Sequence, residues 1–203
     1  MSQMLPEVLA IVAGYLLGTF PTAALVGRLT GHDPTAEGSG NPGATNVYRT
    51  SGRGAGAAVL AIDLAKGAIA AGIGLAVGDH TLGVLTGAAA VLGHVVPVTR
   101  PTRGGKGVAT TFGMTVVCFP GLGLVLGVVF AAVVALTRLA SVGSLVLALL
   151  LPVGVALGGH GGVEVLVTTG VSLLVIAAHH DNIRRLLRHE EAPVRPREAP
   201  ETP

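Results

Sequence analysis

Long runs of apolar residues alternate with short polar segments along almost the whole chain. Seven runs come near the ~20 residues that a helix needs to cross the hydrocarbon of a bilayer. In order they are Leu5–Gly27, Ala55–Val77, Thr81–Val98, Gly107–Cys118, Gly121–Thr137, Gly143–Leu157 and Val163–Ala178. The fourth and sixth are short for full spans. The pattern predicts an all-α fold: a polytopic integral membrane protein with seven transmembrane helices.

Basic residues occupy alternate polar segments between these runs. Residues 28–54, 99–106 and 138–142 and the tail from His179 together hold 12 of the 13 lysines and arginines. Lysine and arginine beside membrane spans are retained in the cytoplasm. We therefore expect the N-terminus outside, the C-terminus in the cytoplasm and an odd number of spans, which seven satisfies. Because no basic stretch precedes the first apolar run, we expect no cleaved secretory signal.

The composition also indicates a membrane protein. Hydrophobic residues make up 50% of the 203 residues and charged residues 12%, and the mean hydropathy is +0.71, whereas about 25% of the residues of a soluble domain are charged. A net charge of +2 is too small to indicate a nucleic-acid partner. The single cysteine, Cys118, excludes an internal disulfide and a cysteine-rich metal site, and we interpret it as a small core hydrophobe.

The end of the chain differs from the rest. Residues 190–203 are rich in proline, glutamate and arginine and have no apolar periodicity. Such a segment cannot bury enough apolar surface to offset the entropy of ordering. We predict a membrane domain over residues 1–189 and a disordered cytoplasmic tail over residues 190–203.

Two ionisable residues fall inside the second apolar run. Asp63 and Lys66 are three residues apart, so both lie on one face of a helix. They could be a mutually neutralised pair that faces the bundle interior. Ionisable residues at membrane depth also often mark a functional site, and the sequence leaves both interpretations open.

The first basic segment contains a stretch rich in glycine and asparagine that ends at Arg49. Its glycines let the backbone turn and expose N–H groups, and the Arg49 guanidinium adds a bidentate cation. This combination suits an oxyanion, particularly a phosphate, although a loop of this composition could also be an ordinary turn. The short polar side chains of the stretch are Ser39, Asn41, Thr45 and Asn46.

The second glycine-rich segment surrounds Lys106 at the start of the fourth apolar run. Gly104, Gly105 and Gly107 flank this lysine. Backbone N–H groups, the helix dipole and one ammonium group together favour an anion. A nucleotide-binding P-loop would need serine or threonine directly after the lysine. Gly107 stands there instead, so the sequence does not predict ATP or GTP binding.

Two further polar segments follow, Thr137–Ser144 and His179–Leu186. His179 and Asn182 are three residues apart and share a helix face at the membrane surface. His179 and His180 face different directions, so we do not expect them to bind a metal together.

Several catalytic patterns are absent from the sequence. It has no aspartate cluster of the kind that holds magnesium, no histidine with an aspartate five residues later, and no Gly-x-Ser-x-Gly motif. We therefore expect no metal, no cofactor and no covalent serine intermediate.

Taken together, five motifs resemble one family. The motifs Ser39–Asn46 continuing to Arg49, Asp63–Gly67, Gly93–Val98, Gly104–Thr110 and His179–Leu186 are similar, in order and spacing, to the bacterial acyl-phosphate:glycerol-3-phosphate acyltransferases of the PlsY type. The resemblance covers roughly Gly14 to Leu187. His180 departs from the family pattern, which usually has arginine there, and this puts one peripheral contact in doubt.

The resemblance implies a seven-helix enzyme of the bacterial inner membrane with a cytoplasmic active site. Its substrates would be acyl phosphate and glycerol 3-phosphate, and its products lysophosphatidic acid and inorganic phosphate. This would be the first committed step of phospholipid biosynthesis.

The resemblance also implies roles for individual residues. Ser39, Thr45 and the loop Gly104–Gly107 would hold the acyl-phosphate group. The contacts to glycerol 3-phosphate would come from Arg49, Lys106, Ser144, His179 and Asn182, whereas Asn41, Asn46 and His94 would have supporting roles. Among all of these we expect the catalytic group to be Ser39, Arg49, Lys106, His179 and Asn182.

Acyl phosphate is a mixed anhydride with a good leaving group, so we expect direct transfer, with the proton passing to a substrate phosphate oxygen or to His179. The main alternative is a small membrane transporter or lipid flippase, which would also account for seven spans and a buried Asp63–Lys66 pair. Transporters, however, place polar sites near the bilayer midplane and often contain inverted repeats. Here the polar motifs lie on one side of the membrane, and no repeat is apparent.

Overall fold

The computed structural model describes residues 4–99 and 104–194, and within these ranges every regular element is a helix. The helices are α1 (Met4–Gly18), α2 (Thr22–Thr30), α3 (Ala44–Ser51), α4 (Arg53–Val77), α5 (His80–Val95), α6 (Val108–Cys118), α7 (Pro120–Thr137), α8 (Ala140–Leu157), α9 (Gly162–Ala178) and α10 (His180–Leu187).

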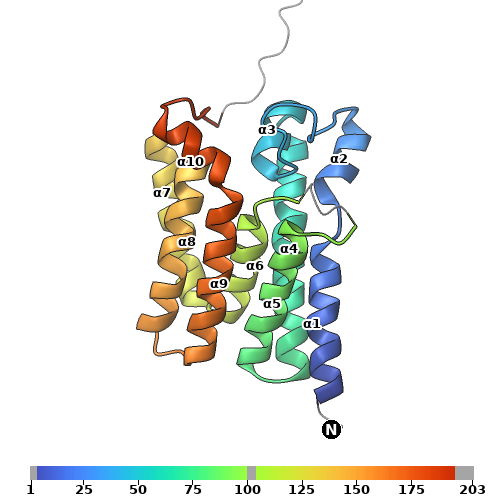
Figure 1. The fold of residues 1–203 in the computed structure, drawn as a ribbon, viewed down its shortest axis with the longest axis vertical. Coiled ribbons are helices and arrows are strands. Elements are labelled where there is room, and N and C mark those ends of the chain that lie inside the picture. Colours follow the sequence, from blue (N-terminus) through green and yellow to red (C-terminus); the bar gives the residue numbers. More distant parts are fainter. Residues whose placement is uncertain (1–3, 100–103, 195–203) are drawn as a thin grey trace, which may run out of the picture.

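The longer helices run side by side as a bundle, and the short helices α2, α3 and α10 lie together at one end of it (Figure 1). Helix α4 packs against α1, α3, α5 and α6, whereas α8 connects α7 to α9. The bundle therefore has two parts joined through α5 and α6, with α10 at the end of one part and α2 and α3 at the same end of the other (Figure 1).

Glycines allow α4 and α6 to cross at very short range. A Cβ atom on Gly67 would lie 1.9 Å from the carbonyl oxygen of Thr110, and one on Gly113 would lie 2.0 Å from the carbonyl oxygen of Leu64. No side chain fits at either position while the helices keep this separation. Small residues serve in this way where membrane helices pack together, and this crossing positions the start of α6 beside α4.

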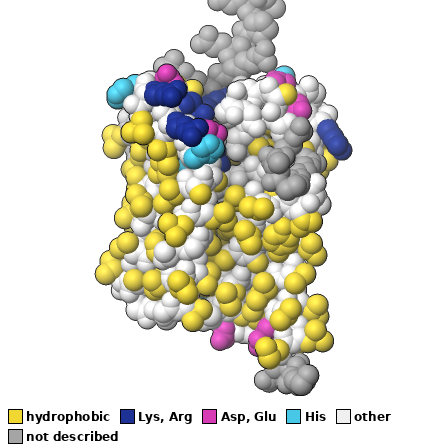
Figure 2. Space-filling view, viewed as in Figure 1, with side chains coloured by type: hydrophobic (Ala, Val, Ile, Leu, Met, Phe, Trp, Pro, Cys, Tyr) yellow, Lys and Arg dark blue, Asp and Glu magenta, His cyan; other side chains and the backbone are white. Residues whose placement is uncertain are grey.

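The outer surface is apolar over most of the bundle. Large hydrophobic side chains such as Leu124, Leu166 and Leu173 are more than 60% exposed. Figure 2 shows a broad hydrophobic surface below a cluster of basic side chains at one end. Four helical segments are long and apolar enough to cross a membrane, or five if the pair α9–α10, bent by 57°, is one span. Helices α5 and α6 are apolar but shorter.

Two predicted segments differ from the helices of the structure. The first run, Leu5–Gly27, is interrupted between α1 and α2, where Thr19 bonds back to the carbonyl of Leu16 and Pro21, which has no N–H, precedes α2. The sixth run begins three residues earlier than predicted, at Ala140, and α8 has 18 residues. Helix α8 is therefore as long as α7, and both are long and apolar enough to cross a membrane.

The buried ion pair supports the interruption of the first helix. Lys66 Nζ lies 2.9 Å from Asp63 Oδ1 and donates to the carbonyl oxygens of Gly18 and Phe20 at 3.3 and 3.1 Å. Nδ1 of His94 lies 3.1 Å from the same ammonium group. The pair is thus neutralised internally, and it also satisfies carbonyl groups that the end of α1 leaves without helical partners.

The segment after α10 has defined contacts as far as Val194, which departs from the disorder predicted from residue 190. The carboxylate of Glu191 accepts bonds from Asn182 and Arg185, and Val194 N donates to the carbonyl of Arg138 at 2.8 Å. The prediction of disorder considered only how much apolar surface the segment could bury, so it could not include these hydrogen bonds to distant polar groups. The remainder of the predicted tail, residues 195–203, lies outside the described residues, as do Arg100 and Arg103.

Candidate active site

A cavity of about 290 Å³ opens at the basic end of the bundle. Residues from the loop before α3, from α3, from the start of α6, from α8 and from the α9–α10 bend all contribute to its wall. Most of the residues predicted for the site line it: Ser39, Asn41, Thr45, Asn46, Arg49, Lys106, Gly107, Ser144, His179 and Asn182.

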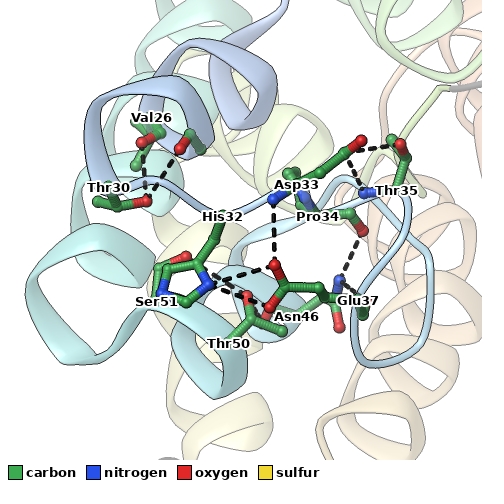
Figure 3. Close-up of polar contacts among 11 residues, drawn as sticks. Val26, Thr30, His32, Asp33, Pro34, Thr35, Glu37, Asn46, Thr50 and Ser51 are labelled. Atoms are coloured by element: carbon green, nitrogen blue, oxygen red, sulfur yellow. Dashed lines mark hydrogen bonds and ion pairs between the residues drawn. The ribbon is translucent and has the colours of Figure 1, made fainter.

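The loop between α2 and α3 is held by Asn46, as Figure 3 shows. Its Oδ1 accepts from the backbone N–H of Ser39 at 2.8 Å, and its Nδ2 donates to the carbonyls of Pro34 and Glu37 at 2.8 and 3.0 Å. Three hydrogen bonds from one buried amide fix the loop on α3. Asn46 therefore positions the Ser39 segment.

A second set of contacts closes the base of the same loop (Figure 3). Nδ1 of His32 lies 3.1 Å from Glu37 Oε2, and the Asp33 carboxylate accepts from both the N–H and the hydroxyl of Thr35. These bonds leave the side chains of Ser39, Asn41 and Thr45 at the cavity wall. Short polar side chains in a fixed loop suit an oxyanion.

Lys106 reaches the cavity from the start of α6. Its Nζ donates to Oδ1 of Asn182, so two predicted residues 76 positions apart in the chain are joined directly. Gly107, with φ of +81°, provides the left-handed turn between the lysine and the helix at no steric cost. Burial lowers the pKa of Lys106 to about 8, with Glu191 acting to raise it and Arg185 and Arg49 acting to lower it.

His179 lies at the bend between α9 and α10, where only 2% of its surface is exposed. Its Nδ1 lies 2.7 Å from the carbonyl of Val175. Because a carbonyl only accepts, Nδ1 carries the hydrogen and Nε2 of the neutral ring has a free lone pair. The bend thus presents a proton acceptor to the cavity beside Asn182.

Arg49 extends from α3 towards the segment that follows α10. One of its terminal nitrogens donates to the carbonyl of Ala192 at 2.6 Å, while its buried Nε has no hydrogen-bond partner among the described residues. A buried donor without a partner costs free energy. A bound anion would satisfy this donor.

Glu191 is a cavity residue that the sequence analysis missed. Its carboxylate accepts from Asn182 Nδ2 at 2.6 Å and from Arg185 Nε at 2.7 Å. Burial alone would raise the pKa of this carboxyl group, but the hydrogen bonds from Arg185 and Asn182 hold the pKa below its ordinary value. The Glu191 carboxylate, an anion of the chain itself, therefore already pairs with Arg185 and Asn182.

Gly104 and Gly105 lie apart from the other predicted residues. They line a smaller cavity next to Lys66 and Pro97, and Gly105 N donates to the carbonyl of His94 at 3.1 Å. The structure therefore divides the predicted glycine loop. Gly107 lines the main cavity, whereas Gly104 and Gly105 line the smaller one. His94 and Asp63 line both cavities and lie between them.

The inner wall of the main cavity is apolar. Five large side chains, contributed by α4, α6, α7 and α8, form it: Leu60, Leu64, Phe112, Phe130 and Leu147. The sequence analysis missed this wall because its members look like ordinary hydrophobic residues of a span. Ser141, another lining residue, has a buried hydroxyl that helps to hold the pKa of the Glu191 carboxyl group below its ordinary value.

The chain matches the family model described as "Glycerol-3-phosphate acyltransferase" over residues 8–189. A protein of that name from Desulforudis audaxviator is 42% identical over 189 residues, which cover 93% of this chain and 96% of the relative. Another, from Shewanella sp. (strain MR-4), is 38% identical over the full length of both chains.

Two crystal structures are also similar to this fold. Both are described as PlsY, an integral membrane glycerol 3-phosphate acyltransferase, and both are 31% identical over 92% of this chain and 94% of the other. The glycerol 3-phosphate form superposes with a TM-score of 0.88, and the lysophosphatidic acid form with a TM-score of 0.86.

Proposed function

This chain belongs to the glycerol-3-phosphate acyltransferase family, and from that premise we propose that it transfers a fatty acyl group from acyl phosphate to the 1-hydroxyl of glycerol 3-phosphate. Like its family, it is an integral membrane acyltransferase of phospholipid synthesis. The products are lysophosphatidic acid and inorganic phosphate.

One observation carries the proposal: a single cavity has a cationic polar end and an apolar inner wall. Arg49 and Lys106 lie at the polar end, and side chains such as Phe112 and Phe130 lie along the inner wall. A fatty acyl chain joined to a phosphate has the same division of character. Apolar lining with a few placed polar groups is typical of sites for such ligands.

We assign the acyl-phosphate group to Ser39, Thr45 and the N–H groups at Gly107. Glycerol 3-phosphate is assigned to Arg49, Lys106, Ser144, His179 and Asn182. The unpartnered Nε of Arg49 and the ammonium of Lys106 would neutralise phosphate charge as the two anions approach. Asn46 holds the loop, and we assign supporting roles to Asn41, Gly104 and Gly105.

In the proposed reaction, the 1-hydroxyl oxygen of glycerol 3-phosphate attacks the carbonyl carbon of acyl phosphate. A carbon–oxygen ester bond forms, the bond from the carbonyl carbon to the phosphate oxygen breaks, and phosphate leaves with the electron pair. The hydroxyl proton passes to a phosphate oxygen or to Nε2 of His179. Alignment of the reactants and stabilisation of developing charge lower the barrier, so the mechanism assigns no role to a metal or to an enzyme nucleophile.

We also propose seven spans, formed by α1 with its continuation α2 and by α4, α5, α6, α7, α8 and α9. Basic residues gather at the end of the bundle that carries the cavity (Figure 2). By the positive-inside rule, that end faces the cytoplasm of the bacterial inner membrane and the N-terminus is outside. Residues 1–189 then form the catalytic domain, and the segment that follows them is on the cytoplasmic side.

The test is an assay of the purified protein in detergent with both substrates. Phosphate release that requires both acyl phosphate and glycerol 3-phosphate supports the proposal. Release with an acyl-carrier thioester as donor, and none with acyl phosphate, would contradict the proposed donor. Transport of a lipid without acyl transfer would favour the flippase alternative.

Two substitutions separate the proposed roles. Lys106→Ala should lower kcat by at least about 100-fold, the scale on which loss of one charge-stabilising donor acts. His179→Gln should retain measurable turnover if the ring only positions the substrate, and should lose about 100-fold or more if it accepts the proton. Near-normal activity of Lys106→Ala would defeat the assignment.

A further inference from the structure

Three potential metal ligands converge at the end of the bundle opposite the cavity. They are His80 at the start of α5, His160 before α9, and Glu164 in the first turn of α9. One ligand atom from each lies within 4.8 Å of the other two. The carboxylate is buried, with 8% of the side chain exposed, whereas the two histidine side chains are 38% and 34% exposed, so a small ion can reach the cluster from solvent.

Hydrogen bonds orient two of these groups. Nε2 of His80 lies 2.7 Å from the carbonyl oxygen of Cys118, and because a carbonyl only accepts, this nitrogen carries the hydrogen. A histidine that binds a metal typically donates its other ring N–H in this way. Glu164 is fixed by Gly161 N, which donates to Oε2 at 2.9 Å.

Nδ1 of each histidine faces an oxygen of the Glu164 carboxylate. Nδ1 of His80 lies 2.5 Å from Glu164 Oε1, and Nδ1 of His160 lies 3.7 Å from Glu164 Oε2. In the His80 tautomer that bonds Cys118, Nδ1 has a lone pair directed at a carboxylate. Such a contact is stable only if a cation, either a proton or a metal ion, lies between the two atoms.

We propose that His80, His160 and Glu164 form a site for a divalent transition metal, with Zn²⁺ as the best match. Two imidazoles and one carboxylate are an established zinc donor set that leaves a fourth position for water. To admit the ion at its usual bond lengths of about 2.0–2.2 Å, Nδ1 of His80 and the carboxylate must move slightly apart. The partial exposure of His80 permits this movement.

The surroundings of the cluster also suit a bound ion. Phe119 packs edge-on against both imidazoles, with ring centroids 5.2 Å from His80 and 4.7 Å from His160, and the two imidazoles are stacked at 5.3 Å. An apolar ring beside the ligands limits solvent and lowers the local dielectric. Thr81 donates to the Glu164 carboxylate at 3.4 Å.

A bound metal would link helix ends that are far apart in the sequence. It joins the start of α5 to the start of α9, and through Cys118 and Phe119 to the junction of α6 and α7. All these loops lie at the end of the bundle away from α3 and α10 (Figure 1). The proposal therefore does not depend on the acyltransferase assignment, because metal would bind far from Lys106 and support the bundle without entering the reaction.

The experiment measures metal binding by the intact, detergent-purified protein, prepared without a polyhistidine tag. Zn²⁺ is titrated in competition with a chromophoric chelator, and Co²⁺ serves as a spectroscopic probe. We expect one tight equivalent per chain, visible d–d absorption with Co²⁺, and a rise in Tm on adding Zn²⁺, because a ligand that binds only the folded state stabilises it.

The principal variants are His160→Ala and His80→Ala, with His32→Ala as the matched control. His32 also contacts a single carboxylate, that of Glu37, but it belongs to no group of three possible metal ligands among residues 4–99 and 104–194. Both cluster variants should weaken Zn²⁺ binding by at least about tenfold, the scale on which loss of even an outer partner acts. His32→Ala should bind as the parent does.

Three results would contradict the proposal. The first is that the parent protein binds Zn²⁺ no more tightly than His160→Ala does, in which case the cation between His80 and Glu164 is a shared proton. The second is an equal loss of binding in His32→Ala. The third uses a further variant. Because His80→Ala also removes the bond to Cys118, Glu164→Gln provides a further variant that keeps an acceptor for Gly161 N. Retention of full Zn²⁺ affinity and of the Co²⁺ spectrum in both Glu164→Gln and His160→Ala would count against the site.

Discussion

At the scale of single residues, the site depends on a few polar atoms whose partners are fixed. Asn182 illustrates this: its Oδ1 accepts from Lys106 and its Nδ2 donates to Glu191. The sequence predicted Asn182 and Lys106 but not Glu191, because a glutamate in a proline-rich tail has no local feature that marks it. Proximity in the chain linked His179 with Asn182, which share one turn, but could not link either of them with Lys106.

The pKa of Lys106 predicts how activity depends on pH. With burial lowering that pKa to about 8, the ammonium is charged below this pH and neutral above it. We therefore expect kcat/KM for glycerol 3-phosphate, which reports on the free enzyme, to fall as the pH rises through about 8. Lys106→Arg should move this alkaline limb to higher pH, and a limb that stays in place in that variant would assign it to another group.

Glu191 should compete with substrate for the cationic group. Its carboxylate holds Arg185 and Asn182, so a phosphate must displace it or share these donors. We expect Glu191→Gln to lower KM for glycerol 3-phosphate. The control is Glu190→Gln, which changes an exposed neighbour and should leave KM unchanged. A KM that rises in Glu191→Gln would mean that the carboxylate instead helps to shape the site.

At the scale of elements, helix ends and crossings decide where the site residues lie. Helix α1 ends at Gly18, and its free carbonyl groups are satisfied by Lys66 from α4. The bend of 57° between α9 and α10 places His179 at the cavity. The length of the apolar runs predicted the helices α1, α4 and α9, whereas the break after α1 and the bend after α9 depend on groups that other segments contribute.

The crossing of α4 and α6 provides a test at this scale. Gly67→Ala would place a Cβ atom 1.9 Å from the carbonyl oxygen of Thr110, so the helices must separate, at a cost on the order of 1–3 kcal/mol. Gly72→Ala is the matched control on the same helix, because its Cβ would meet no atom within 4 Å. We expect a lower Tm for Gly67→Ala only, and equal Tm values for the two variants would contradict the close crossing.

At the scale of the whole molecule, polarity is divided between the surface and the two ends. The lateral surface is apolar and the cavity opens at the basic end (Figure 2). The candidate metal cluster lies at the other end. Local sequence patterns led us to expect no metal, and they could not indicate this cluster because its members His80 and Glu164 are 84 residues apart.

The proposed orientation can be tested by labelling. The only native cysteine, Cys118, is buried, so introduced cysteines report alone. A membrane-impermeant maleimide should label Gly162→Cys, next to the α8–α9 loop, in intact cells. It should label Arg188→Cys, after α10, only in permeabilised cells. The reverse pattern would invert the topology and place the cavity outside.

Counts of apolar and basic residues in each segment of the sequence were sufficient to determine the all-helical membrane class and the approximate position of each apolar helix. They also showed that basic residues gather in alternate segments. The hydrophobic burial of a helix in a bilayer depends mainly on how many apolar residues follow one another. It can therefore be predicted from the sequence without knowing which other helices pack against it. The tertiary structure alone decided the break after α1, the union of Arg49, Lys106 and Asn182 in one cavity, the inclusion of Glu191, and the cluster around Glu164. These features arise from hydrogen bonds and charges between distant segments, whose strength depends on distances that only packing sets.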